Sequence, residues 1–291
     1  MRTASNRAAV KRVFVLGAGA SFSASSKNKR PRLKFPSQTP LDFQFTNALL
    51  DWQVKSPKWI GEAIARIKNS WKDSIEFSEF GLEQAIIRHL GNAEFLSTAN
   101  PRRTRQLPHT NEFLNDVSHL ITASLERATE GSQKSYKLFS EMFKTSGEHT
   151  DKIITFNYDV LLDSYLLSYL KPQQLYFDAI KPNRNTKISK PKFPYPAMLK
   201  LHGSINWRCS TEDFYKGLLG TNAESDKPTE IDIWLSEDKC PKPDDDVSPL
   251  IVPPIPVKPI TSIEIFRYLW TLAYEYLSDT EEIVVCGYSL P

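Results

Sequence analysis

Four short apolar segments, spread from one end of the chain to the other, constrain the fold more than any other feature. They are VFVL (13–16), KIITF (152–156), AMLKL (197–201) and EIVVC (282–286). Apolar runs of this length are typical of strands buried on both faces of a parallel sheet. A Gly, Asn or His follows each segment directly. Because open α/β sheets hold their ligands at the carboxyl ends of the strands, the sequence predicts an α/β fold with a site along that edge.

The stretch between the first two predicted strands, residues 39–149, is predicted to be a helical insertion packed on the sheet. Thr39 and Pro40 offer a helix N-cap and a first-turn proline. Such apolar stripes are far more often helix cores than cofactor-binding surfaces, and we interpret them as cores. They recur at helical spacing in four groups: Leu41, Phe45, Ala48, Leu49 and Trp52; Trp59, Ala63, Ile67 and Trp71; Leu82, Ile86 and Leu90; Phe113, Val117, Leu120 and Leu125.

The remaining residues, 8–38 and 150–291, are predicted to form one discontinuous sheet domain. Helices are expected over 158–169 and over 263–277, the second capped by Ser262. Seven prolines crowd the chain between positions 241 and 259. They exclude regular helix and central strand from the segment 208–259, which is predicted to consist of loops lying over the site.

Composition points to a cytoplasmic protein. The 291 residues are 40% hydrophobic, and no apolar run approaches the roughly 18–20 residues of a membrane span. The three cysteines, Cys209, Cys240 and Cys286, are too widely spaced for a CxxC zinc pair, and their odd number does not favour a disulfide framework. A signal peptide is not favoured either, because the apolar run 13–16 ends at a glycine and a signal needs roughly 7–15 apolar residues.

The opening segment is strongly basic although the net charge of the chain is only +3. Residues 1–34 contain nine Lys or Arg and no acidic residue. Either this segment is a solvated loop, or it attracts an anionic ligand or a nucleic acid. Nucleic-acid binding is not favoured, because neither this segment nor PRRTR (101–105) belongs to a groove-reading motif or an aromatic stripe.

The loop GAGAS, Gly17 to Ser21, follows the first predicted strand. Backbone N–H groups without large side chains around them donate readily to a phosphate. The loop lacks the Gly-Lys-Ser/Thr ending of a Walker A motif, and Phe22 replaces the third glycine of GxGxxG. No acidic residue follows about 20 positions later to bind a ribose, so an ordinary dehydrogenase is disfavoured.

Three further motifs stand at predicted strand ends. In TFNYD (155–159), Asn157 either binds a sugar hydroxyl or water, or caps the helix that follows. In LHG (201–203), His202 is a candidate general base, although a lone histidine is more often structural. In GYSL (287–290), a strand ends on a glycine and a serine follows.

Taken in order, GAGAS, TFNYD, LHG and GYSL resemble the motifs of the SIR2 (sirtuin) superfamily. The resemblance covers the predicted sheet and its ligand edge, not the inserted helices. It implies a Rossmann-like SIR2 fold in which these motifs line an NAD site. The chain departs from protein-deacetylating sirtuins because it has no zinc module with two CxxC pairs and reads FSASSKNKRPRLKFP after the glycine loop.

The details TFNYD, GYSLP and IVPPIPVKP resemble the bacterial SIR2-like branch found in antiphage defence systems. That resemblance implies an NAD+ hydrolase that releases nicotinamide and ADP-ribose and stops an infected cell by depleting NAD+. NAD+ is then the substrate, and no metal is required. The implied partners are a second copy of the chain or a defence protein such as an ATPase or an Argonaute, with no membrane. The basic loop 27–34 is expected to close over the dinucleotide.

The resemblance also implies roles for individual residues. Asn157 and His202 are the expected catalytic residues: Asn157 orients the ribose and a water, with support from Asp159, and His202 acts as the base. The diphosphate is expected at the glycine loop and the adenosine ribose at the GYSL motif. The full set of expected NAD-binding residues is Gly17, Ala18, Gly19, Ala20, Ser21, Thr155, Asp159, Gly203, Gly287, Ser289 and Leu290.

Two other functions stay open. A deacylase or ADP-ribosyltransferase would need a channel for an acceptor, and the missing zinc module disfavours it. A non-catalytic sensor of NAD+ or ADP-ribose would not need both Asn157 and His202. Pro291 follows the last predicted strand closely, where a doubly wound domain would continue, so a short form, a fragment and one domain of a longer protein are all compatible with the sequence.

Overall fold

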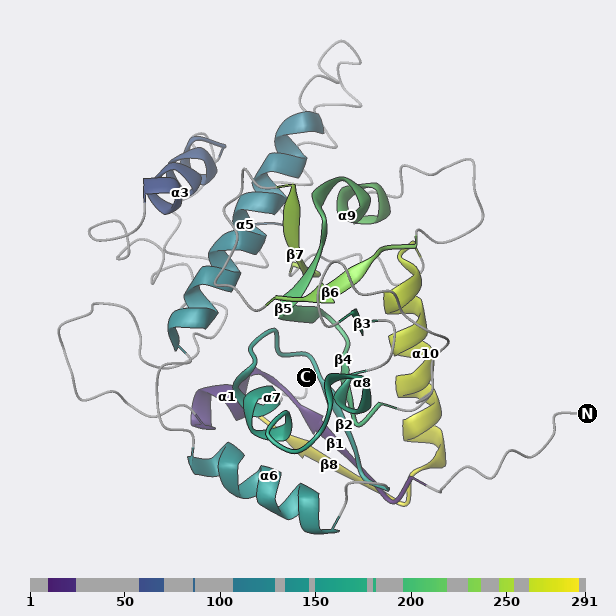
Figure 1. Ribbon diagram of the computed structural model, residues 1–291. Coiled ribbons are helices and arrows are strands. Elements are labelled where there is room, and N and C mark those ends of the chain that lie inside the picture. The colour runs from purple at the N-terminus through teal and green to yellow at the C-terminus, as the bar shows by residue number, and fades with distance from the viewer. Residues whose placement is uncertain are drawn as a thin grey trace, which may run out of the picture.

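The computed structural model describes residues 10–24, 58–70, 86, 107–128, 134–146, 150–176, 180–181, 196–218, 230–236, 246–253 and 262–287. The helices are α1 (Ala18–Ala24), α3 (Lys58–Ser70), α5 (Leu107–Ala128), α6 (Lys134–Ser146), α7 (Leu161–Leu166), α8 (Pro172–Leu175), α9 (Thr211–Leu218) and α10 (Glu264–Asp279). The strands are β1 (Arg12–Leu16), β2 (Lys152–Thr155), β3 (Ile180–Lys181), β4 (Met198–Lys200), β5 (Gly203–Ser210), β6 (Ile233–Leu235), β7 (Val247–Ile251) and β8 (Glu282–Cys286). They form two four-stranded sheets within a mixed α/β fold (Figure 1).

The first sheet confirms the four strands expected from the sequence. Its strand order is β4-β2-β1-β8, and all three neighbouring pairs are parallel. Each strand lies within one residue of its predicted bounds. The prediction that all four are buried is wrong for β8, in which Ile283 and Val285 keep 50% and 45% of their surface exposed. The reason is position, because among the described strands β8 pairs only with β1 and stands at the edge of this sheet.

Helices cover both faces of the first sheet. Phe14 of β1 makes an edge contact with Phe139 of α6, with ring centroids 5.1 Å apart. Lys152 of β2 lies over the ring of Tyr276 of α10. Since Val13 is the register partner of Lys152 and successive residues point to opposite faces, Phe14 and Lys152 face opposite ways. Helices α6 and α10 therefore pack on opposite sides of the sheet (Figure 1).

The second sheet was not expected from the sequence. Its order is β3-β6-β5-β7, with β5 antiparallel to both neighbours. The prediction that 208–259 lacks regular helix and consists of loops is wrong, because this segment contains α9, β6 and β7. Residues 211–218 contain no proline and are free to form a helix. Pro249 is tolerated because β7 stands at the edge of this sheet and, within the part of the chain that the structure describes, pairs only with β5.

Within the predicted helical insertion, the described helices bury most of the expected stripe residues, and Trp59 is partly buried against the same core. Ala63 and Ile67 of α3 and Phe113, Val117 and Leu120 of α5 are all nearly inaccessible to solvent, as are Leu125 and Ile86. Helix α3 packs on α5, and α5 packs on β7. The stripe residues 41–52, 71, 82 and 90 and the predicted cap at 39–40 lie outside the described residues.

Two predicted helices are shorter or begin later than expected. Helix α7 covers only Leu161–Leu166, because the preceding residues form a loop at the end of β2. Helix α10 begins after Ile263, so the N-cap position belongs to Ile263 and not, as predicted, to Ser262. None of the helices in the described ranges is long and apolar enough to cross a membrane.

Candidate functional site

The described residues of the four sequence motifs lie at the same edge of the parallel sheet. Parallel strands end on one side, so the carboxyl ends of β4, β2, β1 and β8 are adjacent in that order. These ends carry His202, Asn157, the loop Gly17–Ser21 and Gly287 respectively. The topology thus brings together residues that are up to 270 positions apart in the sequence (287 minus 17).

Two glycines join the ends of β1 and β8 by direct backbone contact. Gly19 N donates to Gly287 O at 2.9 Å, and Gly17 N donates to Cys286 O at 3.0 Å. A Cβ atom on Gly287 would lie 1.9 Å from Ala20 N, and Gly287 has a φ of 67°. The glycines are therefore needed for strand packing. The amides of Gly17 and Gly19, which the sequence assigned to a diphosphate, are occupied within the protein.

Asn157 is held by hydrogen bonds on both sides of its side-chain nitrogen. Its Nδ2 donates to Gly17 O at 2.9 Å and to Ser21 Oγ at 2.8 Å. Thr155 fixes the backbone below it, since Thr155 Oγ1 donates to Leu16 O and accepts from Asn157 N at 3.1 Å. None of the described residues donates to Asn157 Oδ1, and 8% of the residue surface stays accessible. The amide oxygen is thus the group that Asn157 offers to a ligand.

The side chain of Asp159, not that of Asn157, accepts a hydrogen bond from the first residue of the following helix, α7. Leu161 N donates to Asp159 Oδ1 at 3.1 Å, whereas the Asn157 side chain bonds to Gly17 and Ser21 instead, so the capping alternative for Asn157 is wrong. Asp159 is only 4% exposed. Burial raises the pKa of Asp159, while the charge of Lys200 and a hydrogen bond from Ser21 act in the opposite direction. The site therefore contains a carboxyl group that is costly to ionise.

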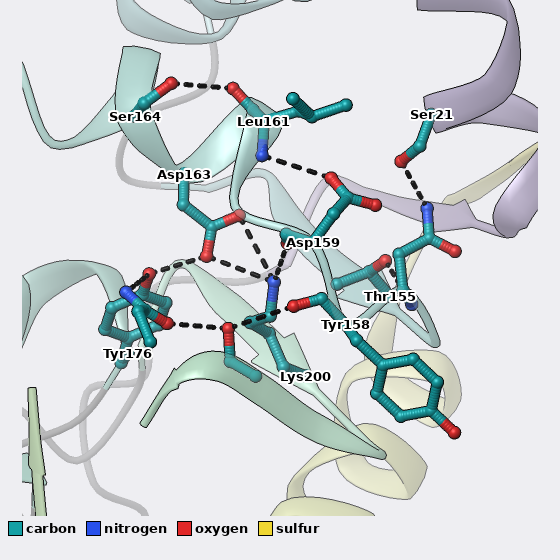
Figure 2. A network of polar contacts seen from close by, with 12 residues as sticks. Ser21, Thr155, Tyr158, Asp159, Leu161, Asp163, Ser164, Tyr176 and Lys200 are labelled. Carbon is teal, nitrogen blue, oxygen red and sulfur yellow. Dashed lines mark hydrogen bonds and ion pairs between the residues drawn. The ribbon is translucent and has the colours of Figure 1, made fainter. Parts of the chain in front are cut away.

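A buried polar network supports the loop that carries Asn157 and Asp159 (Figure 2). Lys200, at the end of β4, is 1% exposed and donates to Asp159 O at 2.5 Å and to Asp163 Oδ1 at 3.1 Å. Tyr176 donates to Asp163 Oδ1 at 2.5 Å. Asn206 of β5 donates to the Tyr176 hydroxyl. The network links the end of β2 to the second sheet.

His202 lies in the two-residue link between the two sheets, after β4 and before β5. Its ring contacts Phe156, with centroids 5.2 Å apart, and Tyr158, with centroids 6.1 Å apart. Val252 N donates to His202 O at 2.8 Å. Gly203 follows with a φ of 82°, and a Cβ there would lie 2.0 Å from Leu250 O. The backbone contacts of His202 and Gly203 therefore fix the position of the His202 imidazole.

Two site residues had not been identified from the sequence. Lys200 interrupts the apolar run AMLKL, and a buried lysine signals a paired charge, so this signal was present. Tyr136 belongs to α6, is 6% exposed, and has its hydroxyl 2.9 Å from Ser21 Oγ. Nothing in the local sequence marks Tyr136, because its contact with Ser21 spans 115 residues.

The other predicted site residues are placed only in part. Ala18 is exposed and Ala20 is buried beside Gly287, with Ala20 N bonded to Gly17 O. Ser289, Leu290 and the basic loop 27–34 lie outside the described residues. Among the residues that the structure describes, no group of three or more His, Cys, Asp or Glu could hold a metal ion.

Comparison with known proteins adds no family. The chain matches no protein-family model, and no curated protein matches it significantly. The fold and the site define it as an α/β protein with a polar site at the carboxyl edge of a parallel sheet.

Proposed function

We propose that the protein is an NAD+ hydrolase with a Rossmann-like, SIR2-type sheet domain. The observation that carries the proposal is the convergence of the described residues of the four motifs on one sheet edge, where Asn157 Nδ2 is bonded to Ser21 Oγ at 2.8 Å. Open α/β sheets bind nucleotides at this edge. The position of Asn157, His202 and the glycine loop at this edge supports the proposal.

The reaction adds water across the bond between nicotinamide and ribose. Water attacks C1′, the bond to the pyridinium nitrogen breaks with its electron pair going to nicotinamide, and the water proton passes to a base. The products are ADP-ribose, nicotinamide and a proton. Nicotinamide is a good leaving group, so the protein has mainly to orient the substrate and one water.

In this proposal the amide oxygen of Asn157 accepts from the water or from a ribose hydroxyl. The side-chain nitrogen of Asn157 has no hydrogen left to donate to a ligand, because Gly17 O and Ser21 Oγ occupy both amide hydrogens. His202 takes up the proton from the neighbouring strand end. A general base of this kind contributes roughly 10²–10⁴-fold to a rate.

The aromatic residues around His202 suit a site that limits water. Phe156 contacts both His202 and Trp270 of α10 by ring edges, and the Tyr158 ring lies near His202 with centroids 6.1 Å apart. Excluding bulk water strengthens the electrostatic interactions that support an oxocarbenium-like transition state. The diphosphate then lies over the exposed Ala18 rather than on the occupied amides of Gly17 and Gly19.

The biological role that we propose is that of an effector in bacterial antiphage defence. NAD+ depletion would require control by a trigger, through a second copy of the chain or a partner such as an ATPase or an Argonaute. We propose a cytoplasmic location on the same ground, because NAD+ is an intracellular substrate.

The test is chromatography of nicotinamide and ADP-ribose after incubation with NAD+, with and without lysate of phage-infected cells. Wild type is compared with Asn157→Ala and His202→Ala, and with Asn115→Ala as a matched control. Asn115 accepts from Ser248 Oγ at the contact between α5 and β7, away from the site. We expect wild type and Asn115→Ala to form both products and the two site variants to form at least a hundredfold less.

Other results would redirect the proposal. Equal turnover by wild type and both site variants would refute the assigned residues. Calorimetric binding of NAD+ without turnover under any condition would favour the sensor, and transfer of ADP-ribose or loss of an acyl group would require an acceptor and favour a transferase or a deacylase.

A further inference from the structure

Asn206 of β5 connects the second sheet to the loop that carries Asn157. The backbone of Asn206 is fixed next to β6, because Ser236 N donates to Asn206 O at 2.9 Å. Its side chain bonds to two buried residues: Ser204 Oγ donates to Asn206 Oδ1 at 2.7 Å, and Asn206 Nδ2 donates to the Tyr176 hydroxyl at 3.2 Å. The buried polar network therefore meets the second sheet at this amide.

From Tyr176, hydrogen bonds continue through two buried charges to the loop (Figure 2). Tyr176 donates to Asp163 Oδ1 at 2.5 Å, and Lys200 Nζ donates to the same oxygen at 3.1 Å. Lys200 also donates to the peptide oxygen of Asp159 at 2.5 Å. A continuous series of hydrogen bonds thus runs from Asn206 to a carbonyl of the loop.

The chemistry of these groups leaves one direction for the bonds. The carboxylate of Asp163 forms an ion pair with Lys200 and can only accept, so the single proton of Tyr176 goes to Asp163. Burial and the charge of Asp163 raise the pKa of the Tyr176 phenol, which therefore keeps that proton. The Tyr176 oxygen can then only accept, and Asn206 must present its NH2 group to it. The reverse amide orientation would draw the proton away and leave two oxygens 2.5 Å apart with no proton between them.

The oxygen of the Asn206 amide controls a second carbonyl of the loop. Ile205 N donates to Tyr158 O at 2.9 Å, and Ser204 Oγ lies 3.4 Å from the same oxygen. A serine hydroxyl has one proton. Asn206 Oδ1 takes it, because this acceptor is 2.7 Å away. Asn206 therefore keeps the Ser204 proton away from the carbonyl of Tyr158, the residue after Asn157.

We propose that Asn206 is a positioning residue of the candidate site, through which the second sheet holds the Asn157 loop in place. Its NH2 group commits the Tyr176 proton to Asp163, and its oxygen holds the Ser204 proton. The effect on turnover rests on the proposed NAD+ hydrolase. The effect on the Asn157 amide does not, and it is measured separately below.

The decisive variant is Asn206→Asp, which keeps the shape of the side chain and adds a titratable group. While protonated, the new carboxyl group can donate to Tyr176 and accept from Ser204, as the amide does. Once ionised, it can no longer donate, and it competes with Asp163 for the Tyr176 proton. The titratable groups that its hydrogen bonds reach are Tyr176, Asp163 of α7 and Lys200 of β4. Partial burial and the Asp163 carboxylate raise the pKa of such a group above the ordinary value of about 4.

The kinetic test compares kcat of each variant with kcat of wild type at the same pH. For Asn206→Asp we expect this ratio to fall about tenfold from about pH 5 to about pH 8, with KM for NAD+ unchanged. Asn206→Leu, which can neither donate nor accept, should lower kcat about tenfold at both pH values. A constant ratio in Asn206→Asp overturns the proposal, as does a wild-type kcat in Asn206→Leu.

Asn115→Asp is the matched control for the added carboxyl group. Asn115 is also partly buried, and its Oδ1 also accepts from a serine, Ser248, at 3.2 Å. It lies on α5, away from the site. Its ratio to wild type should be the same at both pH values, so a pH dependence equal to that of Asn206→Asp would overturn the proposal.

The second test needs no turnover. The ¹H–¹⁵N NMR signals of the Asn157 side-chain amide are assigned with Asn157→Ala. Both amide hydrogens are bonded, to Gly17 O and Ser21 Oγ, so their shifts report the position of the side chain. We expect these signals to move in Asn206→Leu, to move with rising pH in Asn206→Asp beyond any wild-type change, and to match wild type in Asn115→Asp.

Signals that stay at their wild-type positions in both Asn206 variants overturn the proposal. Should Asn206→Leu fail to fold, the pH dependence in Asn206→Asp decides alone, because the same protein is then compared with itself. Should wild type fail to cleave NAD+, the proposed function fails, while the Asn157 signals still decide the role of Asn206.

Discussion

The amino edge and the carboxyl edge of the parallel sheet differ in how their polar groups are bonded. At the amino edge, Arg12 donates to Asp151 Oδ2 through Nη2 at 2.5 Å and Nε at 3.0 Å. Asp151 is fully buried, so its second oxygen, Oδ1, which has no hydrogen-bond partner among the described residues, is closed to a ligand. Lys152 next to it is 7% exposed and lies over Tyr276. At the carboxyl edge, Asn157 is fixed by its nitrogen while its oxygen has no donor among the described residues.

The comparison distinguishes polar groups that stabilise the fold, at the amino edge, from polar groups that are positioned for a ligand, at the carboxyl edge. The amino edge pairs its charges with each other and with a ring. The carboxyl edge uses a buried lysine, a serine and two glycines to hold an amide and a carboxyl group in place. Substitutions at the amino edge should therefore change stability alone, and those at the carboxyl edge should change stability and NAD+ turnover together.

The largest effect is expected for Lys200→Met at the carboxyl edge. It leaves Asp163 buried without its cation, and removal of one partner of a buried ion pair costs about 3–5 kcal/mol of unfolding free energy. Urea unfolding measures the loss. The double variant Lys200→Met with Asp163→Leu should recover part of it, and a double variant no more stable than the single one would contradict this account.

Gly287→Ala should come next, at about 3 kcal/mol, because the new Cβ meets backbone and the residue has a positive φ. The loss of the contact with Gly19 should also reduce NAD+ turnover. Gly61→Ala in α3 is the control, since nothing lies within 4 Å of its Cβ position. That variant should gain about 0.5–1 kcal/mol in thermal unfolding. Equal behaviour of the two glycine variants would refute the packing argument.

A pH effect of at most about 3 kcal/mol is expected at the amino edge. Burial lowers the pKa of Lys152 from 10.5 to about 8. Between these values the unfolded chain binds more protons than the folded one, so stability should rise as pH increases from about 8 to 10.5. Unfolding across this range should show the rise in wild type and not in Lys152→Met. The exposed Lys58→Met should keep the rise, and NAD+ turnover at neutral pH should be unchanged in both variants.

The smallest effect is expected for Thr155→Val, which keeps the side-chain shape and removes the hydroxyl between Leu16 O and Asn157 N. Loss of these hydrogen bonds should cost about 1–2 kcal/mol. Because Thr155 lies beneath Asn157, kcat should fall as well. A stable variant with normal turnover would show that Gly17 and Ser21 alone hold Asn157.

The parallel sheet was predictable from the sequence because its strands are short apolar runs whose carboxyl ends carry the motifs. The exposure of β8 could not be predicted, since the burial of a strand depends on its neighbours in space and not on its composition. The second sheet was missed because seven prolines suggested loops, although Pro249 occupies an edge strand where the missing N–H costs little.

The candidate site likewise contains residues that the sequence could identify and residues that it could not. Asn157, His202 and the glycine loop stood next to predicted strands, and their shared edge followed from parallel topology. Helical periodicity places a residue such as Tyr136 toward a core and says nothing of which polar group it meets there. The choice between Asn157 and Asp159 as the residue that bonds to the start of α7 also needed coordinates, because both side chains are suited to it.

The position of Tyr136 bears on how a protein of this kind can be shortened or recombined. Joining residue 38 directly to residue 150 would look like removal of an accessory module, yet it would also remove Phe139 from the face of β1 and the hydroxyl next to Ser21. Secondary structure alone therefore places the boundary between the sheet domain and the insertion where it does not separate dispensable residues from residues that the sheet and the site need. In exchanges between chains of this architecture, α6 should be transferred together with the sheet it covers.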